Sequence, residues 1–238
     1  MKKTLKYFLL LIICFVLMIS CNTQVFQNRF KLNKAYSLYE KGKNADDDKA
    51  LLDITSTYND IINQKIYAQD RLAAVYRTLA ERSLVKEQYG YSAKYFSEAL
   101  KILPNSPYLR YGLGISYANL ADSADTEDKK TNFLQRAENN INFAISKDPN
   151  NANYYAALAS LKGLQQNDYE AAFENIKKAV EINPNNVDYL FILARIQYSR
   201  GNYNEAVAAY RKISNIASEN NIKQTALNNI NQIIGQQN

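Results

Sequence analysis

This chain repeats one pattern three times: a stretch of apolar residues at helical spacing that ends on a proline. The repetition restricts the chain to folds built from similar helices. The prolines are Pro104, Pro149 and Pro184, at separations of 45 and 35 residues. Before each proline, bulky apolar residues return at i, i+3, i+4 and i+7, which places them on one face of a helix. Because proline disfavours helix in the residue before it, Leu103, Asp148 and Asn183 are predicted helix ends. The pattern predicts an all-α protein built from repeated helices.

Small residues stand where two helices have to approach closely. In the segments that end on the prolines the small residue is Ala99, Ala144 or Ala179. Gly114 and Ala159 take the same place in the helices that come before two of them. Since each helix has one apolar stripe and one small contact residue, the sequence predicts helix pairs that stack on one another.

Residues 107–151 carry the clearest signature of a known family. The sequence Leu113-Gly114-x-x-Tyr117 is followed by Ala137, Ile141, Ala144 and Pro149. This order resembles the tetratricopeptide repeat, whose period is about 34 residues. The resemblance implies a right-handed superhelical solenoid of about four to five helix pairs. The alternative is an unrelated helical bundle.

The unit boundaries follow from the same alignment. A divergent first unit is expected at 32–67, and repeats are expected at 68–106, 107–151, 152–186 and 187–217, so that the repeat domain spans 32–217. Residues 122–130 are an insertion, after which a helix capped by Asp125 or Thr126 is expected to run to about Lys147. Residues 218–238 are predicted to be a helix that caps the open end of the solenoid. Its expected apolar face consists of Ile222, Ala226, Leu227, Ile230, Ile233 and Ile234.

The beginning of the chain has the layout of a secretory signal peptide. Lys2, Lys3 and Lys6 precede an unbroken apolar run over 7–19, which is shorter than the roughly 20 residues that a membrane-spanning helix needs. The run ends in Leu-Met-Ile-Ser-Cys, which resembles the lipobox of bacterial lipoproteins and implies that Cys21 carries the lipid. We therefore expect residues 1–20 to be removed and 21–31 to be a tether. An uncleaved membrane anchor is the alternative.

Export and lipidation imply a location outside the cytoplasm. The expected site is the outer side of the cytoplasmic membrane or the outer membrane, with the protein facing the periplasm or the cell surface. Without the three leader lysines, the chain has 26 basic and 23 acidic side chains, a net charge of +3. This balance lacks the clustered basic face of a nucleic-acid-binding protein, so no nucleic-acid partner is expected.

The composition offers little for catalysis. The sequence has no histidine, and its two cysteines are Cys14 in the leader and Cys21 at the lipid site. A histidine base, a thiol nucleophile and a cysteine or histidine metal site are therefore absent from the mature chain. The acidic run Asp46-Asp47-Asp48 lacks the spacing of a calcium loop and suits a helix start instead. We expect no enzyme activity, no metal and no cofactor, although composition leaves a paired-carboxylate hydrolase open.

The resemblance to tetratricopeptide repeats also implies a concave groove lined by the first helix of each pair. The groove residues that it implies are Arg77, Tyr108, Tyr111, Ile115, Asn119, Phe191, Arg195 and Tyr198, with Asn153, Ala156, Ser160, Asp188 and Ser199 from the same positions. The alternative for Tyr111 and Tyr198 is packing between helices. The family's clamp for acidic tails is not implied, because Gly112 and Ala157 stand at its amide positions.

Two functions are open at this stage. The first is a membrane-anchored scaffold that binds protein partners through the concave groove. The second is a module that binds a small molecule or a cell-wall fragment, or a subunit of a transport or outer-membrane assembly system. Exposed aromatic clusters are typical anchors for a partner chain.

Overall fold

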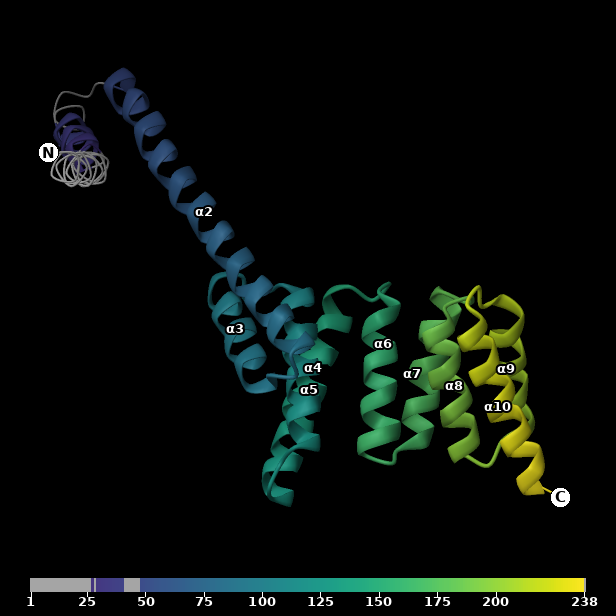
Figure 1. Ribbon diagram of the computed structural model, residues 1–238. Helices are drawn as coiled ribbons and strands as arrows, with labels where there is room; N and C mark the ends of the chain where they lie inside the picture. Colours follow the sequence, from purple (N-terminus) through teal and green to yellow (C-terminus); the bar gives the residue numbers. More distant parts are fainter. Residues whose placement is uncertain (1–26, 28, 41–47, 238) are drawn as a thin grey trace, which may run out of the picture. The chain divides into compact units, whose positions relative to one another are not determined.

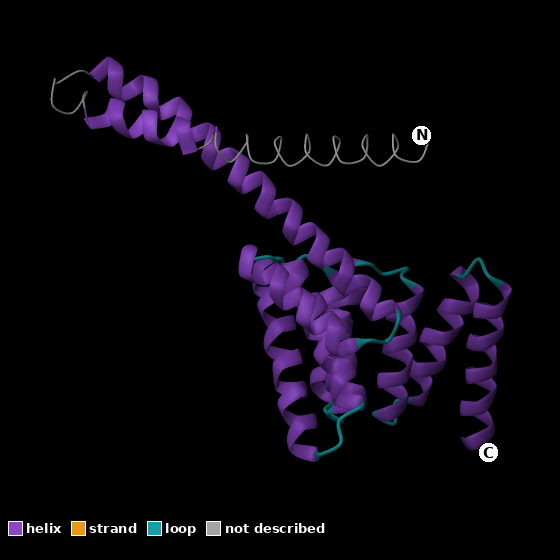
Figure 2. Cartoon of the chain, turned by 60° about the vertical axis from the view of Figure 1, so that its left-hand side comes forward, coloured by secondary structure: helices purple, strands orange, loops and turns teal. Residues whose placement is uncertain are grey.

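The computed structural model describes residues 27, 29–40 and 48–237, and every regular element among them is helical (Figure 2). The predicted signal peptide, the lipobox and Cys21 lie outside the described residues. The chain divides into two compact units, 1–71 and 72–238. The predicted all-α solenoid is confirmed, and the second unit contains the helix pairs that matter for function.

Two of the expected boundaries near the first unit differ from the structure. A helix covers 29–40, so helical structure begins inside the predicted tether. Helix α2, Asp48–Val85, then continues without a break past residue 67, where one repeat was expected to end and the next to begin. The reason lies in the composition, because no glycine or proline interrupts the sequence between Gly42 and Gly90.

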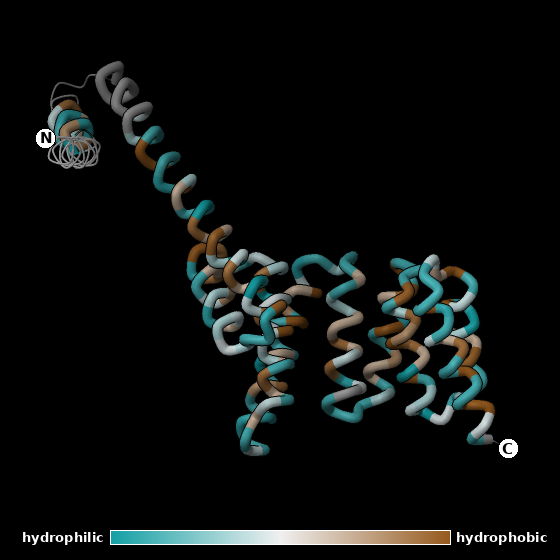
Figure 3. The backbone as a smooth tube through the Cα atoms, in the orientation of Figure 1, coloured by the Kyte–Doolittle hydropathy of each residue, from teal (hydrophilic) through white to brown (hydrophobic). Residues whose placement is uncertain are grey.

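The second unit is a row of helices that follow one another in space as they do in sequence (Figure 1). After α2 come α3 (Tyr89–Ile102), α4 (Pro107–Asp122), α5 (Glu127–Lys147), α6 (Ala152–Ser160), the π-helical turn η1 (Leu161–Gln165), α7 (Tyr169–Ile182), α8 (Val187–Ser199), α9 (Tyr203–Ile216) and α10 (Asn220–Gln237). From α3 onward each helix packs against the next. Apolar residues recur between polar ones along these helices, as expected for elements with one buried face (Figure 3).

The predicted helix stops are confirmed. Leu103, Asp148 and Asn183 are the C-caps of α3, α5 and α7. The expected early start of α5 is also confirmed, since the Thr126 side chain accepts a hydrogen bond from the Lys129 backbone N–H at 3.3 Å. The repeats that end on α3, α5 and α7 therefore stop where proline follows, and α4, α6 and α8 begin where a polar side chain caps the helix.

Close helix contacts form at the small residues. Ala99, Ala144 and Ala179 have no exposed surface. A Cβ atom built on Gly114 would lie 2.7 Å from Cγ1 of Ile141 on α5, so only glycine fits there without a shift. Helix α10 covers the open end of the solenoid by the same kind of packing. Its residues Ala226, Ile230 and Ile233 are buried against α9.

The outer side of α10 departs from the expectation. Leu227 and Ile234 were placed on the apolar face, yet both are exposed. They lie one position after Ala226 and Ile233, which is about 100° further around the helix, so they turn away from the core. The capping helix thus has two apolar residues on its outer side.

Candidate functional site

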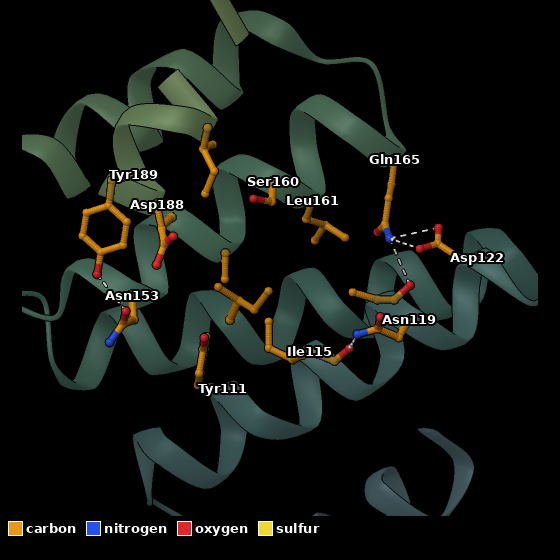
Figure 4. A pocket seen from close by; sticks show the side chains of 15 residues that line it. Tyr111, Ile115, Asn119, Asp122, Asn153, Ser160, Leu161, Gln165, Asp188 and Tyr189 are labelled. Atoms are coloured by element: carbon orange, nitrogen blue, oxygen red, sulfur yellow. Dashed lines mark hydrogen bonds between the residues drawn. The ribbon is translucent and has the colours of Figure 1, made fainter. Parts of the chain in front are cut away.

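The second unit contains a cavity of about 470 Å³ that could hold a ligand, which we call the groove. It is lined from α4 by Tyr111, Ile115, Ala118, Asn119 and Asp122, from α5 by Ile141, from α6 by Asn153, Ala156, Ala157 and Ser160, from η1 by Leu161 and Gln165, and from α8 by Asp188, Tyr189 and Ile192 (Figure 4). The first helices of three successive pairs therefore share one surface. Pockets of this size are typical of ligand sites.

The structure brings three of the predicted groove residues together here. Tyr111, Ile115 and Asn119 lie one turn apart along α4 and are each half-buried. The Asn119 side-chain N–H group donates to the Ile115 carbonyl at 2.8 Å, which fixes the amide on the cavity wall. The other expected members that line the groove are Asn153, Ala156, Ser160 and Asp188.

One end of the groove is closed by a side chain that the sequence did not identify. Gln165 extends from η1 to α4, where its Nε2 lies 3.1 Å from the Ala118 carbonyl and 3.1 Å from each carboxylate oxygen of Asp122. A π-helical turn places one more residue in the turn than an α-helix does, and such turns are frequent at functional sites. The sequence does not predict this π-helical turn, because its residues are equally compatible with an ordinary α-helix.

The other end of the groove is aromatic. The Tyr189 hydroxyl donates to the Asn153 side-chain oxygen at 2.7 Å, which ties α8 to α6. The Tyr111 ring packs against Tyr154 with a centroid separation of 5.0 Å. Burial, and then the neighbouring phenols of Tyr189 and Tyr154, raise the pKa of Tyr111 above its usual value. The Tyr111 phenol therefore stays protonated at neutral pH.

The charge of the groove is negative. It contains two aspartates, Asp122 and Asp188, and no lysine or arginine among the described residues that line it. Asp122 accepts from Gln165, whereas Asp188 has no hydrogen bond or ion pair within the described part of the chain. Figure 4 shows the two carboxylates at opposite ends of the cavity.

A second, smaller cleft lies further along α8. It has a volume of about 190 Å³ and is lined by Arg195, Tyr198, Ser199, Tyr210, Asn229, Gln232 and Ile233. Three predicted groove residues, Arg195, Tyr198 and Ser199, are thus in this cleft and not in the central cavity. The Tyr198 hydroxyl donates to the Gln236 side-chain oxygen at 2.7 Å, so the capping helix closes this end.

The remaining predicted groove residues lie elsewhere. The Tyr108 hydroxyl donates to Glu81 at 2.8 Å, and the Arg77 guanidinium stands 5.9 Å from the centre of the Tyr108 ring. Phe191 is only partly exposed and packs edge-on against Tyr210, with ring centroids 5.9 Å apart. Phe191 is therefore mainly a packing residue, which the repeat position alone did not reveal.

Two other kinds of feature are absent from the described ranges. No group of three acidic or cysteine side chains there could hold a metal ion. None of the described helices has the length and hydropathy required to cross a bilayer.

Comparison with known proteins identifies a repeat family in part of the chain. Residues 163–227 match the tetratricopeptide repeat family. Among curated proteins, none matches the sequence significantly.

Solved structures of the same architecture include TTC0263, a thermophilic TPR protein of Thermus thermophilus. It is 16% identical and superposes with a TM-score of 0.59 over 84% of this chain and 97% of that chain. Human IFIT1, in a dimer with PPP-AAAA, is 17% identical, with a TM-score of 0.63 over 87% of this chain and 46% of that chain. At these identities the likeness concerns the fold alone. The chain thus carries tetratricopeptide repeats within residues 163–227 and has the fold of tetratricopeptide repeat proteins.

Proposed function

We propose that this protein is an exported, lipid-anchored scaffold whose groove holds an extended segment of a partner protein. The observation that carries the proposal is the groove itself, which the first helices of three successive repeats line with aromatic, amide and acidic side chains. Such a mixture of apolar area and a few convergent polar groups suits recognition. Binding, and not catalysis, is the proposed role.

A protein segment fits the arrangement better than a compact ligand does. Asp188 in the groove and Arg195 in the second cleft both lie on α8, seven residues apart, which is about 10 Å along the helix axis. An extended chain covers this distance with about three residues, since it advances about 3.3 Å per residue. One segment can therefore reach both clefts. A small molecule or a cell-wall fragment that occupies the groove alone is the second candidate, favoured by its volume of about 470 Å³.

The membrane part of the proposal rests on the sequence. The basic start, the apolar run over 7–19 and the lipobox before Cys21 support export and lipidation. Two or more acyl chains hold a protein stably on a bilayer, whereas one holds it only marginally. The lipid would keep the groove close to membrane partners, including those of transport or outer-membrane assembly systems.

Site-specific photocrosslinking in living cells tests the proposal. A photoreactive phenylalanine analogue replaces Ile115, which lines the groove, in the full-length protein. The matched control places the same analogue at Glu174, an exposed residue of α7 that lies outside both clefts. We expect a discrete protein adduct from position 115 that is absent from position 174.

Two other results are informative. A small mass increase at position 115 without a protein adduct would favour the small-molecule candidate. Equal adducts from both positions, or an adduct from position 174 alone, would contradict the groove as the partner site.

A further inference from the structure

One carboxylate in the groove has no structural task. Asp188 lies in the first turn of α8, exposed to solvent, and no described residue pairs with it. The cap of this helix is Asn186, whose side-chain oxygen accepts from the Tyr189 backbone N–H at 3.1 Å. An acidic residue in the first turn gains only about 0.3–1 kcal/mol from the helix dipole. The stability of α8 therefore gives only a weak reason for an aspartate at position 188.

Two tyrosines lie at the same end of the groove as this carboxylate (Figure 4). Tyr189 follows it directly, and burial together with the Asp188 charge raises the pKa of Tyr189. Tyr111 projects from α4 into the same end of the cavity (Figure 4). The face of an aromatic ring attracts cations within about 6 Å of its centre. A carboxylate beside such rings forms a suitable setting for an ammonium or guanidinium group.

Among the described residues, no positive side chain lines this end of the groove. The described residues that line the groove include no lysine or arginine, and the arginine of the second cleft, Arg195, is about 10 Å further along α8. The two arginines nearest in sequence to the α4 wall are engaged elsewhere, because Arg110 stands 4.8 Å over the Phe143 ring and Arg136 over the Tyr117 ring. A positive charge bound beside Asp188 would therefore belong to a ligand.

We propose that Asp188, with Tyr111 and Tyr189, forms a subsite that binds a lysine or arginine side chain of the partner segment. This inference rests on the proposed function, since it names the chemistry of the segment that the groove receives. Asp188 accepts the hydrogen bonds of the cation, and the half-buried Tyr111 ring packs against its aliphatic stem, while the buried Tyr189 forms the wall behind them. The groove thus selects basic segments and rejects acidic ones.

A peptide selection tests the subsite. The full chain, immobilised in detergent micelles, is exposed to random nonapeptides that carry arginine, lysine, citrulline or glutamate at the central position. Mass spectrometry then measures the central residue among the retained peptides. The wild type should retain arginine or lysine about tenfold over citrulline, as expected for a hydrogen-bonded charge.

Three variants assign the preference. Asp188→Asn should reduce the ratio of cationic to citrulline peptides to about one, and Asp188→Glu, which keeps the charge, should preserve a preference. The matched control is Glu205→Gln, which removes an exposed, unpaired carboxylate from the first turn of α9 among the described residues. It should leave the ratio unchanged.

The outcomes separate the two levels of the proposal. Peptides retained without a cationic preference, or a preference that survives Asp188→Asn, would overturn the subsite and leave the groove function standing. Retention of no peptide by the wild type would overturn both.

Discussion

Exchange of Gly112 for alanine should destabilise the solenoid, although alanine is the better helix former. Gly112 lies within α4, where a Cβ atom would stand 2.5 Å from Cε1 and 2.7 Å from Cε2 of Phe96, and closer still to Cζ. The ring has no room to retreat, because Phe96 is only 1% exposed. Overpacking of this kind costs about 1–3 kcal/mol.

The net effect follows from two opposing contributions. Alanine in place of glycine inside a helix gains up to about 1 kcal/mol. Contact with three ring carbons puts the steric cost near the upper end of its range, so we expect the free energy of unfolding to fall by about 2 kcal/mol. Because the unit is a repeat array, hydrogen exchange should show the loss chiefly in α3 and α4 and their neighbours.

The matched control is Gly90→Ala. Gly90 lies in the first turn of α3, and no atom lies within 4 Å of its added Cβ, so this variant should gain about 0.5 kcal/mol or more. Urea unfolding followed by circular dichroism measures both variants against the wild type. If Gly112→Ala were to raise the midpoint as Gly90→Ala does, the assignment of Gly112 as a close-contact position would be refuted.

Three further perturbations test other parts of the account. Cys21→Ser should abolish labelling with palmitate and leave unprocessed precursor, and normal maturation of this variant would disprove lipidation at that residue. Ala179→Leu should lower the free energy of unfolding by about 1–3 kcal/mol, because Ala179 has no exposed surface; an unchanged urea midpoint would contradict the packing of α7. Asn186→Ala removes the cap of α8 and should cost about 1 kcal/mol, and faster hydrogen exchange confined to the start of α8 would show it.

Most of the repeat architecture could be predicted because local rules agree with the fold. The stops at Leu103, Asp148 and Asn183 follow from the prolines that come after them, and the start of α5 follows from a capping threonine. Burial of Ala99, Ala144 and Ala179 follows from helical spacing.

The continuity of α2 could not be predicted in the same way. A repeat boundary was expected at residue 67, yet the helix continues across it because no glycine or proline interrupts the sequence there. In this segment the expected boundary between two repeats therefore does not coincide with the end of a helix.

The groove was only partly accessible to sequence reasoning. Repeat positions identify which residues lie on the first helices, and that was enough for Tyr111, Ile115 and Asn119. They do not reveal whether a side chain such as Phe191 packs inward against the next helix. The role of Gln165 depends on the π-helical turn. No characteristic amino-acid pattern distinguishes such a turn from an ordinary α-helix in the sequence.

The central claim is that the groove receives the partner segment, and blocking the groove tests it most directly. The segment identified by crosslinking at position 115 is synthesised as a peptide, and its affinity is measured by calorimetry. Ser160→Trp introduces a large ring into the groove, whereas Glu174→Trp adds the same ring to an exposed position of α7 outside it. With both variants shown to melt like the wild type, we predict that Ser160→Trp weakens binding at least about 30-fold, equivalent to about 2 kcal/mol, and that Glu174→Trp leaves it unchanged. Full affinity in Ser160→Trp would contradict the account.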